Sequence, residues 1–449
     1  MAAAHDPYAS LRYRDFRLFL VGRMFGVIGW QMVQIALGWE LYERTGSALM
    51  LGLVGLVTAI PVVLLALPAG HLADRVDRKA IVVGSQVVFI VMSLALAAVS
   101  YWEGPIYLVY TILLIAGISQ AFNNPARSAF LPRLVPTEVF GNAVTWSSSG
   151  FQLAAVVGPA LGGLVIAIEH RATDAYLIDA ALTLIYLFML LAIRTDGGFG
   201  KSPAGHTVAR SREPMTLQSM MAGMKFVKDT KVVLAAITLD LFAVLLGGAT
   251  ALLPIFAKDI LQVGPEGLGW LRAAPSVGAL LVMLTIAHRP PMQRTGWTLL
   301  LSVAGFGAAT IVFGLSKSFG LSMAMLFMLG GLDGISMIIR STLVQLWTPD
   351  EMRGRVSAVN SVFIDMSNEL GGFESGALAA ALGPVVAVVG GGIGTVVVAT
   401  AVAMKWPELR GLGAMEPPMA QMEVAQKAQM ELDDTDALNS MSKKIDAIT

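Results

Sequence analysis

The sequence predicts an all-α membrane protein whose twelve transmembrane helices form two pseudo-symmetric six-helix bundles. Of its 449 residues, 55% are hydrophobic and 14% are charged, whereas about a quarter of the residues of a soluble domain are charged. The apolar residues come in blocks of about 20, the length that crosses a bilayer core as a helix. One pattern of residues also occurs twice along the chain, which indicates two related halves.

The repeat runs without a gap through its matched positions. Arg127 and Ser128 recur 213 residues later as Arg340 and Ser341. The same interval joins seven further identical pairs: Gly117 and Gly330, Pro136 and Pro349, Glu138 and Glu351, Gly141 and Gly354, Ser148 and Ser361, Gly158 and Gly371, and Gly163 and Gly376. Tandem repeats of membrane helices are the build of many secondary transporters, whose binding site lies between the repeats.

The spanning segments are expected to be helices, because lipid offers the backbone no water partner. We expect them at roughly 16–42, 48–70, 80–101, 106–126, 140–168, 175–193, 231–257, 267–288, 296–315, 320–346, 356–382 and 384–404. The polar stretch between the sixth and seventh segments is typical of a linker. The predicted domains are an N-terminal bundle at 1–193, a cytoplasmic linker at 194–230, a C-terminal bundle at 231–404 and a cytoplasmic tail at 405–449.

The distribution of Lys and Arg predicts the orientation. With a cytoplasmic N-terminus, the external loops hold Arg44, Arg171, Lys258 and Lys317, and most of the 31 basic residues face the cytoplasm. Cytoplasmic loops of membrane proteins carry such an excess of positive charge. We therefore expect a multi-pass protein of the inner (plasma) membrane with both termini in the cytoplasm.

The loop between the second and third segments carries a family signature. It reads Gly70-His71-Leu72-Ala73-Asp74-Arg75-Val76-Asp77-Arg78-Lys79. This loop resembles the signature of the major facilitator superfamily, Gly-x-Leu-Ala-Asp-Arg-x-Gly-Arg-Lys. It departs from that signature at Asp77, where the superfamily prefers Gly, which leaves the turn geometry open. The resemblance implies the major facilitator fold.

The resemblance also implies a cytoplasmic latch. In the superfamily the acid equivalent to Asp74 lies against the N-terminus of the eleventh helix when the transporter is open outward, and a carboxylate is favoured there. The latch residues are then Gly70, Asp74, Arg75, Arg78, Arg127 and Arg340. The alternative is that the basic residues only anchor the topology. Ala287 replaces the acid in the second half, so the latch is expected to be asymmetric.

A second motif lies in the fifth segment. Gly158, Pro159, Gly162 and Gly163 resemble the Gly-Pro-x-x-Gly-Gly core of a motif associated with antiporters of this superfamily, although its upstream glycines are replaced by Thr145 and Ala154. The alternative is a generic small-residue packing face. Three further stretches, at 11–19, 72–78 and 127–132, are similar to the branch that contains enterobactin exporters and multidrug or macrolide efflux proteins.

Polar residues within the first and fourth segments predict a central cavity. Arg23, Trp30 and Gln34 share one helical face, and Gln120, Asn123, Asn124 and Arg127 form a second stripe. We expect these residues to line the cavity, with Arg23 available to an anionic group. The alternatives are that Arg23 reaches the interface or pairs within its own half, and that the second stripe makes buried hydrogen bonds between helices.

Carboxyl groups inside the second half are candidates for proton coupling. They are Asp240, Asp333, Asp365, Glu369 and Glu374, of which Asp240, Asp333 and Glu369 are the leading candidates. Ionisable groups at membrane depth are costly unless they are paired or hydrated, so they are functional candidates. The alternative for each of them is a structural ion pair.

The absence of other motifs narrows the function. The chain has no Cys, no Walker loop and no zinc-protease motif. We expect no enzymatic activity, cofactor, metal or nucleic acid. The leading hypothesis is a monomeric, proton-coupled exporter of a small amphipathic molecule, a siderophore or drug, that works by alternating access. The alternatives are a lipid or lysophospholipid translocase, a solute importer of the same fold, and a membrane-embedded sensor or enzyme.

Overall fold

The computed structural model describes residues 6–194, 217–288, 292–349 and 352–413, and it contains no β-strand within these residues. The first half forms six long helices: α1 (Arg14–Thr45), α2 (Ala48–Arg75), α3 (Arg78–Tyr101), α4 (Ile106–Phe130), α5 (Phe140–Glu169) and α6 (Ala172–Ala192). The second half also has six long helices: α8 (Lys231–Leu246), α10 (Gly264–Ala287), α11 (Thr295–Leu315), α12 (Phe319–Trp347), α13 (Arg353–Leu382) and α14 (Pro384–Lys405).

Eleven spans within the described residues are long and apolar enough to cross a membrane. One of them, Lys231–Ile260, joins α8 to the short helix α9 (Leu253–Ile255) through a break at Gly247 and Gly248. α13 is equally long but more polar, because it carries Asn360, Asn368 and Glu369 on its way through the bundle. With α13 included, the fold is the predicted all-helical one with twelve spans.

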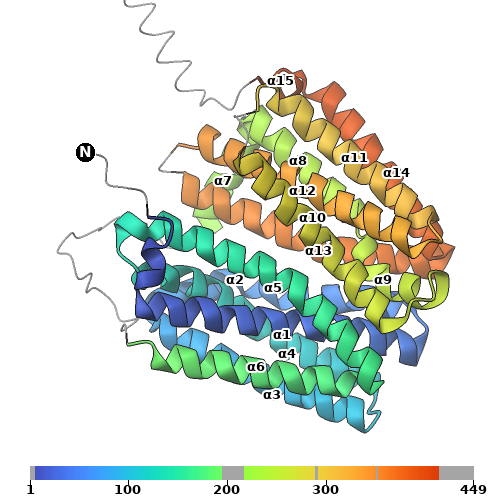
Figure 1. Ribbon diagram of the computed structural model, residues 1–449. Coiled ribbons are helices and arrows are strands. Elements are labelled where there is room, and N and C mark those ends of the chain that lie inside the picture. Colours follow the sequence, from blue (N-terminus) through green and yellow to red (C-terminus); the bar gives the residue numbers. More distant parts are fainter. Residues whose placement is uncertain (1–5, 195–216, 289–291, 350–351, 414–449) are drawn as a thin grey trace, which may run out of the picture.

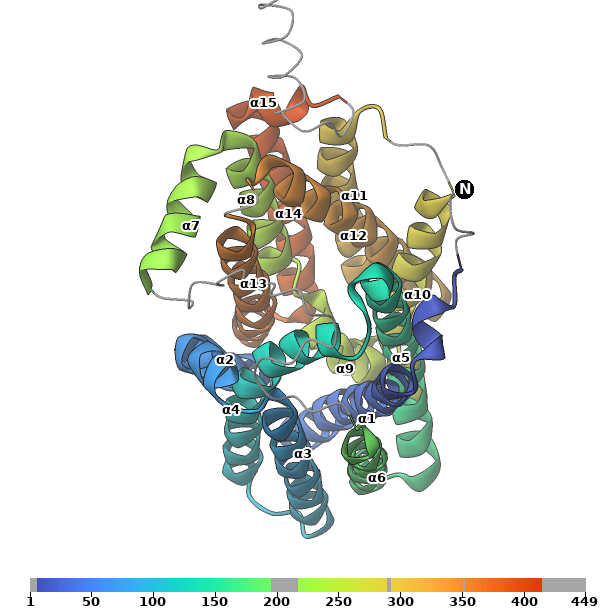
Figure 2. The ribbon, with the colours of Figure 1, turned by 90° about the vertical axis from the view of Figure 1, so that its left-hand side faces the viewer.

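The sequence repeat is also a structural repeat. α5 and α13 begin and end 213 residues apart, and so do the starts of α4 and α12. α1 to α6 form one group of helices, and α8 to α14 form the other (Figure 1). Figure 2 shows the same two groups from the end of the molecule that carries the N-terminus.

Two helix crossings join the groups, α2 with α13 and α5 with α10. At the α5–α10 crossing, a Cβ atom added to Gly163 would lie 2.5 Å from the carbonyl oxygen of Pro265 and 2.9 Å from the Cα of Gly269. At the α2–α13 crossing, a Cβ atom on Gly376 would lie 2.8 Å from the Cα of Gly52. Only glycine permits backbones to approach this closely. Gly163 and Gly376 are repeat mates, so the crossings are related by the pseudo-symmetry.

The two groups meet at one end and diverge at the other. The glycine crossings lie near the C-terminal ends of α5 and α13. At the opposite ends of these helices, Gly141 and Gly354 have no described atom of another segment within 4 Å of an added Cβ. Figure 1 shows the groups separating towards the end that carries the N-terminus. The structure is therefore closed at the far end and open towards the termini.

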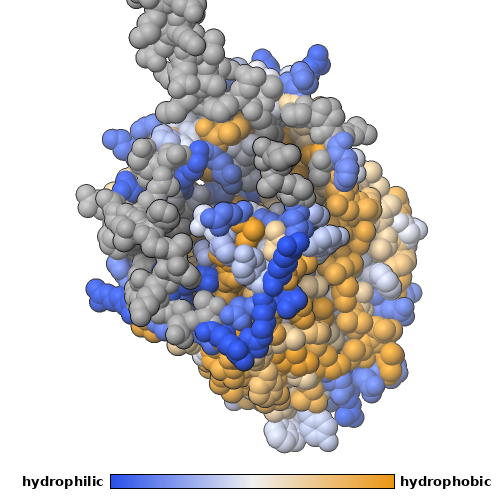
Figure 3. Space-filling model, turned by 60° about the vertical axis from the view of Figure 1, so that its left-hand side comes forward, coloured by the Kyte–Doolittle hydropathy of each residue, from blue (hydrophilic) through white to orange (hydrophobic). Residues whose placement is uncertain are grey.

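The outer surface suits a bilayer. Large apolar side chains such as Leu64, Phe188, Leu301 and Val397 are exposed on the flanks. In Figure 3, hydrophobic residues gather on the side of the molecule, whereas hydrophilic residues cover the end near the termini. Lipid tails solvate such a surface, so the chain is a multi-pass membrane protein.

The described part of the predicted linker ends in a helix, α7 (Leu217–Asp229), which the sequence pattern did not predict. Its buried residue Val227 packs with Val356 and Val359 of α13. Residues 195–216 of the linker lie outside the described residues. In the tail, α15 (Pro407–Arg410) is tied to α8 by the ion pair of Lys231 with Glu408, at 2.7 Å. The remainder of the tail, 414–449, is not described.

We expect Gly163→Val to force the closed end apart, because the new side chain would overlap the backbone of α10. The chain has no Cys, so spin labels at introduced cysteines Glu103→Cys and Lys317→Cys report the distance between the two groups at this end. The distance should increase by about 2 Å or more, the scale of helix shifts in conformational transitions.

Gly84→Val is the matched control for this substitution, since a Cβ there meets no described atom of another segment within 4 Å. An unchanged distance in Gly163→Val would show that this crossing does not hold the end closed.

Candidate functional site

A cavity of about 670 Å³ lies between the two groups of helices. This volume is in the range of sites for small molecules. Apolar residues including Trp30, Val62, Phe306 and Met337 form part of its wall. The polar lining is drawn from both halves: Gln31, Gln34, Thr58, Gln120, Asn124, Gln152, Thr250, Arg272, Ser276, Asp333, Asn368 and Glu369.

Four of the seven residues predicted for the cavity line it: Trp30, Gln34, Gln120 and Asn124. Asn123 and Arg127 do not. Asn123 is 3% exposed, because its side chain is turned by about 100° around α4 from that of the next residue, Asn124. Arg23 does not line the cavity either; its guanidinium lies 5.9 Å from the ring centroid of Phe151. The cavity wall therefore begins about two turns further along α1, at Trp30.

Arg272 is the basic group of the cavity. Its Nη1 donates a hydrogen bond to the carbonyl oxygen of Thr250 at 3.2 Å. That carbonyl belongs to the short 3₁₀ turn that follows the break in α8 at Gly247 and Gly248. The break thus supplies a main-chain acceptor at membrane depth, which a continuous helix would have used internally.

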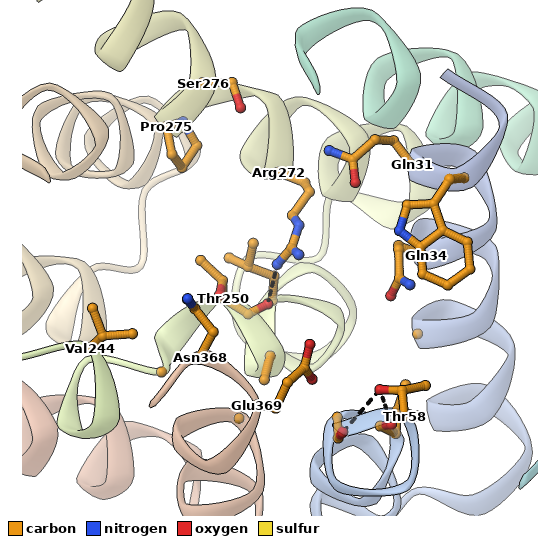
Figure 4. A pocket seen from close by; sticks show the side chains of 18 of the residues that line it. Gln31, Gln34, Thr58, Val244, Thr250, Arg272, Pro275, Ser276, Asn368 and Glu369 are labelled. Atoms are coloured by element: carbon orange, nitrogen blue, oxygen red, sulfur yellow. Dashed lines mark hydrogen bonds between the residues drawn. The ribbon is translucent and has the colours of Figure 1, made fainter. Parts of the chain in front are cut away.

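Glu369 of α13 extends into the cavity opposite Arg272 (Figure 4). The two groups interact electrostatically. Asn368 lies beside them, and Gln34 extends into the same space from α1 (Figure 4). The cavity therefore offers the cation of Arg272, the carboxyl groups of Glu369 and Asp333, and several amides to a ligand.

The role of Arg272 was not predicted, although its position within an apolar segment was visible in the sequence. A basic residue in the middle of a span was the available signal. What the sequence did not show was that Thr250 and Glu369, 22 residues before it and 97 residues after it, lie around its guanidinium.

Asp240 of α8 and Arg340 of α12 form an ion pair inside the second half. They are 7% and 5% exposed. This pairing is the structural alternative that the sequence left open for Asp240. Arg340, predicted for the latch, thus contacts its own half in this conformation.

The other candidate acids differ in position. Asp333 and Glu369 both line the central cavity. Asp333 also borders a second, smaller hollow that it shares with Asp240. The side chain of Asp365 lies outside the described residues. No group of three His, Asp or Glu residues within the described chain is placed to hold a metal ion.

The signature loop lies at the open end. Arg75 is exposed, and Arg78 donates a hydrogen bond to the carbonyl oxygen of Ala129 at 3.3 Å. Arg127 donates to Asn124 at 3.3 Å. Gly70 has no described atom of another segment within 4 Å of an added Cβ. The side chain of Asp74 lies outside the described residues, so the latch stays a prediction.

Asp77, the departure from the signature, has a structural role. Its carboxylate accepts a hydrogen bond from the backbone N–H of Lys79 at 3.0 Å and caps the N-terminus of α3. Asp is a favoured residue at this position because the first turn of a helix leaves donors unpaired.

The glycine motif of α5 contacts two neighbours. A Cβ atom on Gly158 would lie 2.5 Å from the Cβ of Gln31, and one on Gly162 would lie 2.9 Å from the Cα of Met32, both on α1. Gly163 contacts α10 of the other half, as does the carbonyl of Pro159. The motif therefore packs α5 within its own half and also closes the far end of the cavity.

Comparison with known proteins agrees with this architecture. A profile of the family described as transmembrane secretion effector matches residues 5–434. The chain belongs to this family of the major facilitator superfamily. Among its relatives is the enterobactin exporter EntS of Escherichia coli (strain SMS-3-5 / SECEC), which is 26% identical over 405 residues, 90% of this chain and 94% of the relative. The enterobactin exporter EntS of Shigella boydii serotype 4 (strain Sb227) is 26% identical over 396 residues, 88% of this chain and 92% of the relative.

Solved transporters share the fold. A bacterial homolog of the human lysosomal transporter Spinster, in an inward-facing and occupied conformation, superposes with a TM-score of 0.69 at 13% identity and covers 91% of this chain and 100% of its own. The nucleoside transporter NupG gives a TM-score of 0.64 at 16% identity and covers 87% of this chain and 98% of its own. At these identities the similarity concerns the fold alone.

We expect Asp240→Ala to lower the stability of the protein by about 3–5 kcal/mol, because it leaves Arg340 charged and buried without its partner. The measurement is thermal unfolding of the purified protein in detergent.

The double variant Asp240→Ala/Arg340→Met should recover part of that loss, since it removes the second charge as well. A double variant less stable than Asp240→Ala alone would show that the ion pair is not the reason for the loss.

Proposed function

We propose that this protein exports a siderophore or a similar small amphipathic molecule from the cytoplasm in exchange for protons. In this proposal it lies in the inner membrane with both termini in the cytoplasm, and it alternates between inward-open and outward-open states. The observation that carries the proposal is the polar cavity between two repeat-related halves, closed at one end by glycine crossings.

The chemistry of the cavity suits such a cargo. Trp30 offers a flat apolar surface, and the amides of Gln31, Gln34 and Asn368 offer hydrogen-bond donors and acceptors. Arg272 is available for a negatively charged oxygen, because guanidinium groups bind planar anions well. The enterobactin exporters among the relatives support a siderophore as the cargo.

The mechanism follows from the crossings. In the described state the cavity is closed beyond Gly163 and Gly376 and open towards the termini. Outward opening requires these crossings to separate while the signature loop approaches the start of α13. Asp74 then acts as the latch, because a carboxylate stabilises a helix N-terminus. The cavity thereby becomes accessible from the opposite side of the membrane.

Glu369 supplies the coupling in this proposal. When it is ionised, its carboxylate accepts hydrogen bonds from donor groups of a cargo that also contacts Arg272. When it is protonated, its carboxyl group holds the cargo less strongly, so proton binding and cargo binding oppose each other reciprocally. Exchange requires this competition.

The function can be tested in everted membrane vesicles that contain this protein, with labelled enterobactin as the probe. We expect accumulation that a protonophore abolishes. Accumulation that survives the protonophore would exclude proton coupling. If no accumulation occurs, enterobactin is the wrong cargo, and a comparison of compounds retained by cells with and without the protein would identify another.

We expect Glu369→Gln to abolish pH-driven accumulation, because the amide cannot bind and release a proton, and to leave binding of the probe within about threefold of the wild type. The measurements are vesicle transport and equilibrium binding.

The control is Glu374→Gln on the same helix, at a residue that does not line the cavity. Full pH-driven transport by Glu369→Gln would remove Glu369 from the coupling mechanism.

We expect Asp74→Asn to slow transport about fivefold, since the loss of roughly 1 kcal/mol from the latch destabilises the outward-open state. Membrane insertion, measured by the yield of purified protein, should not change.

Asp77→Asn in the same loop is its control, because Asn preserves the helix cap. Equal rates in all three proteins would exclude a latch at Asp74.

A further inference from the structure

A second hollow lies inside the helix group of the second half, beside the central cavity. Its volume is about 10 Å³, roughly the room that one water molecule requires. Four polar side chains line it, those of Asp240, Ser302, Asp333 and Ser336. A buried water needs two to four polar partners, so both the size and the lining of this hollow suit a single water.

Asp333 borders both the hollow and the central cavity, as do Val244 and Phe306. Asp240 lines the hollow but not the cavity, and it is paired with Arg340. Ser336 lies between Asp333 and Arg340 on one face of α12, because residues three and four positions apart share a face. A continuous series of polar groups therefore runs from the cavity to the buried ion pair.

Ser302 of α11 can hold a water in this series. Its hydroxyl donates a hydrogen bond to the carbonyl oxygen of Thr298 at 2.8 Å. The hydroxyl oxygen then remains as an acceptor. A water in the hollow could donate to it or to either carboxylate and accept from a protonated one.

We propose that one bound water in this hollow links Asp333 to the Asp240–Arg340 pair and relays the coupling proton into the second half. The inference rests on the proposed proton exchange. In the relay, the carboxyl of Asp333 gives its proton to the water oxygen while the water gives one of its own protons to Asp240. Asp333 becomes ionised, Asp240 becomes neutral, and the water is regenerated.

Arg340 has a carboxylate on its own helix group both before and after the proton transfer. Before it, Arg340 is neutralised by Asp240. After it, Arg340 lies on the same face of α12 as the new carboxylate of Asp333, seven residues earlier. On the cavity side, Arg272 and Glu369 line the space that Asp333 borders. The relay therefore connects the charge state of the cargo site to the ion pair that holds α8 against α12.

A high-resolution cryo-electron microscopy map of the full-length protein provides the test that needs no cargo. We expect density for a water between Asp240 and Asp333 in the wild type. We expect its loss in Ser302→Val, because the larger apolar side chain fills the hollow. A well-resolved hollow without density in the wild type would overturn the relay, whatever the protein transports.

Transport in proteoliposomes tests the role of the water, with enterobactin as the probe. We expect Ser302→Val to reduce pH-driven accumulation at least tenfold, while counterflow exchange without a pH gradient stays within twofold of the wild type. Ser302→Ala keeps the room and three polar partners, so it should retain both activities within about twofold. If Ser302 only packs against its neighbours, Ser302→Val should reduce counterflow exchange as much as it reduces pH-driven accumulation.

Thr310→Val is the matched control. Thr310 is a buried hydroxyl residue of α11, and it bonds back to the carbonyl oxygen of Phe306 as Ser302 does to Thr298. It borders neither hollow, so its loss should leave coupling intact. Normal pH-driven accumulation by Ser302→Val would overturn the relay. If the wild type transports no enterobactin, the proposed cargo is wrong. The cryo-electron microscopy map then tests by itself whether the hollow binds a water.

Discussion

The close approach of backbones at two glycine crossings is the constraint on which the rest of the structure depends. Gly163 against Gly269 and Gly376 against Gly52 bring the two halves into contact where no side chain would fit. Gly163 and Gly376 are repeat mates, so the same sequence feature occurs in both crossings that close the far end of the cavity. These contacts are van der Waals contacts between backbones, and the Tyr42 hydroxyl adds a hydrogen bond to Asp259 of the other half.

A second constraint comes from the cost of charge inside the membrane. Arg340 is compensated by Asp240, and Arg272 by the carbonyl of Thr250 and the charge of Glu369. The first arrangement is buried within one half, and the second faces the cavity. This difference separates a group that stabilises the helix packing from one that a ligand can reach, although both are arginines within apolar segments. In the proposed proton exchange, such groups change partners rather than lose them, because an unpaired charge at membrane depth is costly.

Much of the candidate site was predictable from helical spacing. Trp30 and Gln34 are four residues apart and line the cavity together, as Gln120 and Asn124 do. Spacing failed for Arg23 and Asn123, because the depth and direction of the cavity depend on where the neighbouring helices diverge. Sequence patterns also did not predict α7. This helix is stabilised by the packing of Val227 on α13 rather than by a long apolar stretch of its own.

The sequence alone indicated the tandem halves and the number of spans, because these depend on local composition and on a repeat within one chain. The resemblance of the loop at 70–79 to a known signature indicated the superfamily. The tertiary structure decided which polar groups meet. Thr250 reaches Arg272 only because α8 breaks at Gly247 and Gly248, and Asp240 reaches Arg340 only because α8 lies against α12. Such encounters depend on crossing angles and helix breaks, which residue spacing does not encode.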